Sequence, residues 1–400
     1  MEFRDLKKQY AVLQKDMDEA ILTAVRSGAY IMGPQVKELE AQLAEYVGVR
    51  HCLTCANGTD ALTLALKAWG IGPGDVVFVP DFTFFSSAEV VALEGATPVF
   101  VDVCEDTFNL DASDLERAVE AVLAEGRLRP RVVVAVDLFG LPADYPAIRA
   151  LADRYGLLIL EDGAQGFGGS VCHSKRACAF GDIATTSFFP AKPLGCYGDG
   201  GAVFTDNDEW AALIASYRVH GKGSFKYDNV RIGLNSRLDT LQAAVLQVKL
   251  NAFKAYELDA VNQAAALYTE FLSHSERSEE SLVGTPIIPE GYRSSWAQYT
   301  IRLRDRAQRD RLQAALKEKG IPAMVYYPKP MHLQTAFACH SAFACHSERS
   351  EESRSFGKPQ DDICPVATSL CDRVLSLPLH PYITEEEIRA VCEAIIQALR

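Results

Sequence analysis

The segment 186-TSFFPAKPLGCYGDGG-201 decides the fold class of this chain. Its single lysine, Lys192, follows two phenylalanines and stands between two prolines. Such apolar surroundings disfavour the charged ammonium form and leave an amine that can condense with an aldehyde. Most lysines are solvated surface residues, and that is the alternative interpretation. The segment nevertheless predicts a lysine that forms a Schiff base with pyridoxal 5'-phosphate (PLP).

A second segment, Asn57-Gly-Thr-Asp60, offers a place for the phosphate of this cofactor. Apolar residues recur at helical spacing directly after it, so a helix begins near Thr59 or Asp60. The unpaired amide groups at that end of a helix attract an anion, and Gly58 lets the backbone approach it closely. The alternative is an ordinary helix capped by Thr59 or Asp60.

Two acidic residues, Glu161 and Asp162, follow a run of apolar residues at 156–160 that indicates a buried parallel strand. Acidic side chains at the carboxyl end of such a strand lie in the ligand crevice of an open α/β sheet. We expect Asp162 to pair with the pyridine nitrogen and Gln165 to bond the ring oxygen, whereas Glu161 points the other way. The alternative is a loop of small residues with a capping acid.

Three phenylalanines in the segment 80–89, Phe82, Phe84 and Phe85, follow another predicted strand at 76–79. Any one of them could stack on a flat heterocyclic ring. The alternative is that all three pack in the core, which is the more common position of a phenylalanine.

Together these motifs resemble the sugar-nucleotide aminotransferases of the DegT/DnrJ/EryC/StrS group. The resemblance runs from 3-FRDLKKQY-10 through 28-GAYIMGP-34 and 235-NSRLDTLQA-243 to 376-SLPLHPY-382. It implies an α/β protein of the aspartate-aminotransferase (type I) PLP fold. It also implies an enzyme that moves an amino group, from L-glutamate, to UDP-2-acetamido-2-deoxy-3-oxo-glucuronate for polysaccharide biosynthesis.

The resemblance also implies the residues of the site. Lys192 is the catalytic, cofactor-linked lysine, and the other cofactor-binding residues are Gly58, Thr59, Phe84, Asp162, Gln165, Ser187 and Asn235. The residues on the sugar side are Gly28, Tyr30, Arg237, Tyr326 and Tyr327. Asn235 matches an asparagine that reaches the phosphate from a neighbouring subunit, which implies a homodimer with shared active sites. The alternative is that Asn235 caps a helix at 238–249.

One position departs from the pattern of this subgroup. Its usual Val-His-Tyr-Pro is Val325-Tyr-Tyr-Pro328 here, so an imidazole on the sugar side is replaced by the uncharged Tyr326. Alternative substrates are therefore dTDP-linked 3-keto or 4-keto 6-deoxyhexoses. A PLP-dependent sugar dehydratase would have a histidine in place of Lys192, and an inactive relative is a further alternative. A dinucleotide-binding oxidoreductase is another alternative, but it would need a Gly-x-Gly-x-x-Gly motif after the first strands, and the sequence has none there.

Charge and cysteine content limit the partners and the compartment. The net charge is −13, which argues against nucleic acid or an anionic membrane as a partner. An anionic nucleotide sugar needs local basic residues, and the stretch 218–237 contains several. The 11 cysteines and the absence of an apolar leader indicate a cytoplasmic protein with free thiols. The pair Cys52 and Cys55 has no second pair, and we expect no metal site.

The order of elements indicates two domains. Strands expected at 76–79, 98–102, 131–137, 157–160, 183–188 and 201–205 alternate with helices, which is typical of a mostly parallel sheet. With helices at 11–30 and 35–47, they form an N-terminal arm and a large PLP-binding domain, residues 1–254. Residues 255–400 form a smaller α+β domain with strands at 296–303 and 323–327 and helices near 306–319 and 384–399.

A repeated octapeptide interrupts the second domain. His-Ser-Glu-Arg-Ser-Glu-Glu-Ser occurs at 274–281 and again at 346–353. It has no hydrophobic face with which structural repeats could stack. We interpret the segments near 274–281 and 336–355 as translated repetitive DNA inserted in tolerant surface loops. The pairs Cys339-His340 and Cys345-His346 are then by-products of copying and not zinc ligands.

Overall fold

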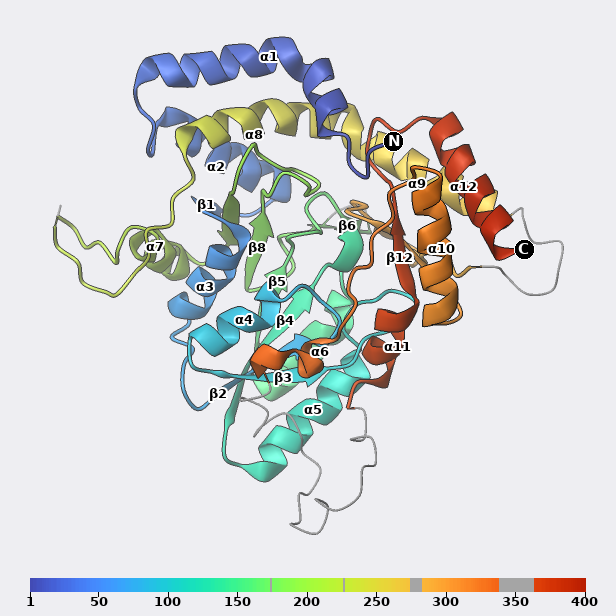
Figure 1. Cartoon of the computed structure of the whole chain (residues 1–400). Coiled ribbons are helices and arrows are strands. Elements are labelled where there is room, and N and C mark those ends of the chain that lie inside the picture. Colours follow the sequence, from blue (N-terminus) through green and yellow to red (C-terminus); the bar gives the residue numbers. More distant parts are fainter. Residues whose placement is uncertain (173–174, 226, 274–282, 338–362) are drawn as a thin grey trace.

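Seven strands form the central sheet, in the order β1-β9-β8-β5-β4-β2-β3 (Figure 1). Their bounds are β1 (His51–Cys55), β2 (Asp75–Pro80), β3 (Thr97–Val101), β4 (Arg129–Val136), β5 (Leu158–Asp162), β8 (Ile183–Ser187) and β9 (Gly201–Thr205). Strands β3, β2, β4, β5 and β8 run parallel, whereas β9 pairs antiparallel with β8 and β1. The mostly parallel sheet confirms the α/β class. The computed structural model describes the whole chain except residues 173–174, 226, 274–282 and 338–362.

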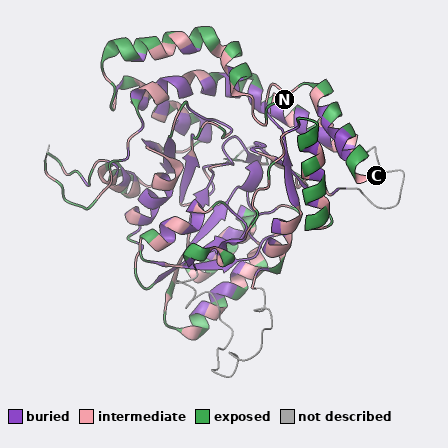
Figure 2. Cartoon of the chain, in the orientation of Figure 1, coloured by how far each residue is buried: buried purple, intermediate pink, exposed green. Residues whose placement is uncertain are grey.

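Helices cover both faces of this sheet, and alternate strand residues pack on opposite faces. The helices are α3 (Gly58–Ala68), α4 (Ser86–Leu93), α5 (Ala112–Glu125), α6 (Tyr145–Tyr155) and α7 (Asp208–Tyr217). On β2, Val77 and Val79 share an apolar cluster with residues of α3 and α4. Val76 and Phe78 share another cluster with residues of α5 and α6. Burial on both faces explains the continuous apolar run of this strand (Figure 2).

The N-terminal helices lie along one edge of the molecule. They are α1 (Leu6–Ser27) and α2 (Pro34–Val47), and they pack with α8 (Thr240–Ala252) (Figure 1). Helix α1 begins earlier than the expected residue 11 because the Asp5 side chain accepts a hydrogen bond from the amide of Lys8 at 2.8 Å. It ends before the expected residue 30 because Gly28 adopts a φ of 67°, which ends a helix.

The C-terminal part is a smaller α+β region. It contains α9 (Leu258–Ser273), α10 (Arg306–Glu318), α11 (Pro365–Arg373) and α12 (Glu385–Leu399), with the antiparallel pair β11 (Tyr299–Arg302) and β12 (Val374–Leu377). The short strands β6 (Ser170–Val171), β7 (Lys175–Arg176) and β10 (Tyr292–Arg293) form a separate small sheet. A π-helical turn at Phe253–Glu257 joins α8 to α9, so one helical segment crosses the expected boundary at residue 254. The division into two domains remains a prediction.

Three sequence-based expectations in this region need correction. The strand expected at 323–327 is wrong, because only Met324 forms a bridge, to Ser376. The strand that pairs with β11 is β12, which was not predicted from the sequence. Strand β11 itself is shorter than the expected strand at 296–303. Helix α8 begins at Thr240 and is preceded by Asp239, so Asn235 does not cap it.

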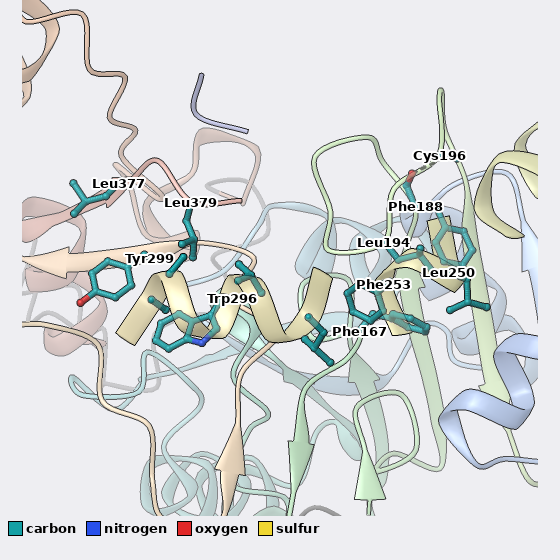
Figure 3. Packing of buried hydrophobic residues seen from close by; sticks show 14 of the residues in the cluster. Phe167, Phe188, Leu194, Cys196, Leu250, Phe253, Trp296, Tyr299, Leu377 and Leu379 are labelled. Carbon is teal, nitrogen blue, oxygen red and sulfur yellow. Dashed lines mark hydrogen bonds between the residues drawn. The ribbon is translucent and has the colours of Figure 1, made fainter. Parts of the chain in front are cut away.

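A single hydrophobic cluster joins the two parts of the chain. It includes Phe188, Leu194 and Cys196 of the segment between β8 and β9, with Leu250 and Phe253 at the end of α8. It continues to Trp296, Tyr299, Leu377 and Leu379 of the C-terminal part (Figure 3). The segment that carries Lys192 is therefore fixed at both ends in the core.

Some expectations fall on segments that the structure does not describe. The repeat-derived insertions lie almost wholly within 274–282 and 338–362, and both Cys-His pairs lie there as well. Cys52 and Cys55 lie on β1 as buried free thiols. In the described part of the chain, no helix combines the length and the apolar character that a membrane crossing requires.

Candidate active site

A cavity of about 500 Å³ lies at the carboxyl ends of β5 and β8, beside the first turn of α3. The predicted site residues that line it are Gly58, Thr59, Phe84, Asp162, Gln165, Ser187, Lys192, Tyr326 and Tyr327. A second hollow of about 610 Å³ lies beside the N-terminus of α7, but its Arg50 pairs with Asp208 and its Arg149 pairs with Asp182. The first cavity is therefore the candidate active site.

The first turn of α3 forms one end of the cavity. Its cap is Asn57, whose side chain accepts from the amide of Asp60 at 2.7 Å, so neither Thr59 nor Asp60 is the cap. A Cβ atom on Gly58 would lie 2.7 Å from the Cβ of Ser187, so only glycine allows this close packing. The helix start thus presents amide groups beside the hydroxyls of Thr59 and Ser187, an arrangement that fits a phosphate.

A buried carboxylate forms the floor of the cavity. Asp162, the last residue of β5, is 4% exposed and accepts from Ser87 Oγ at 2.7 Å and from the Ala164 amide at 3.2 Å. Burial raises the pKa of Asp162, whereas these hydrogen bonds and the charge of Lys192 lower it. A carboxylate held in this way can accept a hydrogen bond from a protonated ring nitrogen. Glu161 turns away and accepts backbone hydrogen bonds from Phe180 and Gly181.

Gln165 is fixed by contacts at both ends of its amide. Its Oε1 accepts from the amide of Phe139 at 2.8 Å, and its Nε2 donates to the Tyr327 hydroxyl at 3.0 Å. Burial raises the pKa of Tyr327 well above its usual value, so the hydroxyl keeps its proton. The two side chains therefore form one hydrogen-bonding unit on the wall of the cavity.

Lys192 reaches the cavity from the segment between β8 and β9. Its amide donates to the carbonyl of Phe189 at 2.9 Å, and neighbouring Phe188 and Leu194 are buried (Figure 3). Burial lowers the pKa of the Lys192 ammonium, Asp162 raises it, and Arg4 lowers it. The amine is thus available in its neutral, nucleophilic form more readily than a solvated lysine.

Of the three candidate phenylalanines, Phe84 alone lines the cavity. It is 53% exposed, and its ring centroid lies 6.2 Å from that of Tyr327. Phe82 is buried, and Phe85 packs on Phe337. Phe84 is therefore the ring that is free to stack on a flat ligand.

An aspartate–histidine pair supports this wall of the cavity. Asp81 Oδ2 lies 2.6 Å from His332 Nδ1, and the other oxygen of Asp81 accepts from the His332 amide at 2.7 Å. The pair fastens the Phe84 segment to the segment that carries Tyr327. Cys364 lies within 4.8 Å of both groups, as in some metal sites, but Asp81 and His332 direct their polar atoms at each other.

Among the polar lining residues, sequence reasoning missed Ser86, Asp199 and Gln298, and it placed Asn57 in the phosphate segment without recognising it as the helix cap. Asn57 could have been found as a preferred N-cap residue directly before the predicted helix. Gln298 comes from the C-terminal part of the chain, and nothing in the local sequence marks it. Its Oε1 is buried without a hydrogen-bond partner among the residues that the structure describes.

Four predicted residues do not line the cavity of their own chain: Gly28, Tyr30, Asn235 and Arg237. They lie on two neighbouring segments, because the Thr240 amide donates to the carbonyl of Tyr30 at 2.9 Å and Ile31 forms a bridge with Asp239. We call these four residues the outer patch. Of the nearby basic stretch, Arg218 is buried and paired with Glu40 at 2.6 Å, so it is not free to bind a substrate.

The profile of the DegT/DnrJ/EryC1/StrS aminotransferase family matches residues 12–396. The chain is similar to the UDP-2-acetamido-2-deoxy-3-oxo-D-glucuronate aminotransferase of Pseudomonas aeruginosa, with 42% identity over 99% of each chain. It is also similar to the dTDP-3-amino-3,4,6-trideoxy-alpha-D-glucose transaminase of Streptomyces venezuelae, with 37% identity over 98% of this chain and 94% of that one.

Solved structures are also similar to this chain over most of its length. A DegT DnrJ EryC1 StrS aminotransferase from Brucella abortus has a TM-score of 0.88 and 47% identity, covering 99% of this chain and 98% of that one. A Bacillus subtilis structure with bound cofactor PMP has a TM-score of 0.80 and 26% identity, covering 97% of this chain and 82% of that one. These neighbours confirm the type I PLP fold and the cofactor class expected from the sequence.

Proposed function

Because this chain belongs to the DegT/DnrJ/EryC1/StrS aminotransferase family, we propose that it transfers an amino group from L-glutamate to UDP-2-acetamido-2-deoxy-3-oxo-glucuronate. The observation that carries the proposal is the pair of Lys192 and Asp162 facing one cavity beside the first turn of α3. The relative from Pseudomonas aeruginosa supports the choice of sugar, because its similarity extends over 99% of each chain.

The lining residues fit a bound PLP. The amide groups of Gly58 and Thr59 with the Ser187 hydroxyl would hold its phosphate, because the close packing of Gly58 on Ser187 brings these groups to the same end of the cavity. Asp162 would hold the proton of the ring nitrogen, and Gln165 with Tyr327 would bond the ring oxygen. Phe84 would cover the ring. When bound, the cofactor supplies an electron sink for the substrate carbon.

Lys192 would move the proton in each half of the reaction. Its neutral amine would take a proton from the carbon of the amino donor and deliver it to the C4′ carbon of the cofactor in the first half, and it would move a proton from C4′ to the sugar carbon in the second half. Burial of the lysine serves this role because it lowers the pKa toward neutrality. The anchored segment on either side keeps the amine at a fixed position relative to Asp162.

We further propose a homodimer in which the outer patch of one subunit completes the cavity of the other. The patch contains Arg237 and Asn235, groups that suit a sugar carboxylate and a phosphate. The adjoining segment between α7 and α8 extends away from the body (Figure 1) and exposes Phe225 (71%), Tyr227 (85%) and Ile232 (90%). Large apolar side chains gathered at the surface are typical of an interface between proteins. The nine free thiols of the described residues fit a reducing compartment, and we propose the cytoplasm.

A second candidate substrate is a dTDP-linked keto-6-deoxyhexose. The observation in its favour is Tyr326, an uncharged residue at a position where the subgroup has an imidazole. Among the described lining residues, Lys192 is the only cation of the cavity, so a uronate carboxylate would depend on Arg237. A neutral hexose has no carboxylate and would not need Arg237. The Streptomyces venezuelae relative, named for such a sugar, keeps this alternative open.

The test is amine transfer from glutamate to a panel of UDP-linked and dTDP-linked keto sugars, with the amino sugar identified by mass spectrometry. A visible absorbance band that disappears with glutamate would separate an aminotransferase from a dehydratase or an inactive relative. The variant Arg237→Met should abolish discrimination in favour of the uronate, whereas Gln247→Met, at an exposed contact with Glu38, is the matched control. Turnover of dTDP sugars alone would favour the second candidate.

A further inference from the structure

The N-terminal segment, residues 3–10, was singled out by its sequence but has no part in the proposed function. It contacts two separate parts of the molecule, the segment after β12 and the turn between α8 and α9. The carbonyl of Phe3 accepts from the Leu379 amide at 3.3 Å, and Lys8 Nζ donates to the Tyr382 carbonyl at 2.6 Å. Gln9 Nε2 donates to Glu257 Oε1 at 2.9 Å, at the π-helical turn. The N-terminal segment is thus held both to the C-terminal part and to the turn between α8 and α9.

Arg4 connects this fastened segment to the segment that carries Lys192. Its Nη2 donates to the carbonyl of Pro193, the residue directly after the lysine, at 3.3 Å. No carboxylate of the described ranges comes within 4 Å of the guanidinium, so its charge has no direct counter-ion there. A partly buried arginine held in this way is costly to retain for stability alone.

The charges near Arg4 show what its position does. Two charged groups act on the amine of Lys192: Asp162 favours the ammonium form and Arg4 disfavours it, in addition to burial. Lys249, packed over the ring of Tyr197, lies in the same field, and burial together with Arg4 lowers its pKa to about 8, while Glu257 raises it. Asp199 lines the same cavity as Lys192. The guanidinium therefore adds positive charge that acts on the reactive amine, although Arg4 does not line the cavity.

We propose that Arg4 is a positioning residue for Lys192: it holds the Lys192 segment through the Pro193 carbonyl and sets a fixed positive charge that acts on the amine. This inference rests on the proposed function, in which Lys192 binds the cofactor. Arg4 touches neither cofactor nor substrate, and it acts only through the lysine and its segment.

The alternative is that Arg4 only anchors the N-terminus, and two readouts separate these roles. The first is the pH midpoint for reductive methylation of Lys192 with formaldehyde in the full-length apo-protein, followed by mass spectrometry of its peptide. The second is the rate at which PLP adds to the apo-protein. Both readouts report on the lysine itself, and a purely structural anchor would change only the melting temperature.

Four variants complete the experiment. Arg4→Met removes both the charge and the hydrogen bond to Pro193. Arg4→Lys keeps the charge but loses the planar guanidinium group that donates this hydrogen bond. Lys8→Met loosens the same segment at its contact with Tyr382, and Lys7→Met changes an exposed residue of the same segment. If Arg4→Met does not fold, Arg4→Lys still tests the hydrogen bond through the rate of PLP addition.

We expect Arg4→Met to shift the methylation midpoint to higher pH, because a like charge that disfavours the ammonium form is lost. We expect PLP addition to slow by about tenfold in both Arg4 variants, the change that corresponds to losing one hydrogen bond from a charged group. Lys8→Met should lower the melting temperature and leave the midpoint unchanged, and Lys7→Met should change neither.

An unchanged midpoint in Arg4→Met together with an unchanged rate in both Arg4 variants would overturn the inference. The failure of the proposed function has a different signature. In that case PLP would not protect Lys192 of the wild-type protein from methylation, whatever stands at position 4.

Discussion

A mixture of two inactive variants should recover activity if the outer patch completes the cavity of a partner subunit. Lys192→Ala removes the amine from the cavity, and Asn235→Ala removes an outer-patch side chain that does not reach the cavity of its own chain. In a hybrid dimer, one site then combines an intact cavity with an intact patch, and the other site carries both defects. Random re-association gives half hybrids, each with one intact site, so activity should return to about a quarter of the wild-type value.

The assay is amine transfer after the two variants are unfolded together, refolded and purified as dimers. A mixture of Lys192→Ala with Asp162→Ala is the matched control, because both residues line the cavity of the same chain and no hybrid site is intact. That control should remain inactive. Recovery in the control, or none in the Lys192 and Asn235 mixture despite dimer formation, would refute the shared-site arrangement. A fully active monomer in sedimentation would do the same.

Three further outcomes follow from the cavity and its surroundings. Lys192→Ala should lose the visible absorbance of the lysine-bound cofactor and all transfer while keeping its melting temperature; activity in this variant would disprove the assignment of the lysine. Asp162→Asn should keep PLP but lose a hundredfold or more in turnover, roughly 3 kcal/mol in the barrier at about 1.4 kcal/mol per decade, and wild-type kinetics would assign the ring nitrogen to another acid. Burial raises the pKa of Glu161 to about 7 from 4.5, so its stabilising proton is fully present below pH 4.5 and is lost as pH rises through 7. Urea unfolding should therefore show a loss of up to about 3 kcal/mol over this range that is smaller in Glu161→Gln, where the neighbouring buried Asp137, whose pKa burial also raises, still titrates, and equal slopes for the two proteins would contradict it.

The sequence was sufficient for the elements whose physical causes are local. The strands buried on both faces have continuous apolar runs, and the helix after Asn57 is marked by its apolar periodicity. Asp162 and Gly58 could be singled out because they lie at the end of a strand and the start of a helix, where ligand groups gather. Lys192 could be singled out by its apolar neighbours. The residue pattern alone left Phe82, Phe84 and Phe85 as candidates, and only the family resemblance selected Phe84. Which of the three leaves the core depends on packing by Phe337 and Tyr327.

Features set by contacts between distant segments could not be predicted. Strand β12 forms because it pairs with β11, and residues 323–327 do not form a strand because only Met324 finds a partner. Gln298, directly before β11, lines the cavity although it belongs to the C-terminal part, and Asp81 contacts His332, which lies far from it in the sequence. The position of Asn235 outside the cavity of its own chain follows from the bridges at Val219 and Asp239. The family resemblance implied this position, but no local pattern specifies it.

The hydrophobic cluster that joins Phe188 and Leu194 to Tyr299 and Leu377 has a consequence for cooperativity. Neither part of the chain can expose its share of this cluster without exposing the other's, so the two parts should lose structure together. Calorimetry of the cofactor-free chain should then show one heat-absorption peak, not two. A fragment ending at residue 254 would leave Phe253 and Leu250 uncovered, and it should aggregate instead of folding.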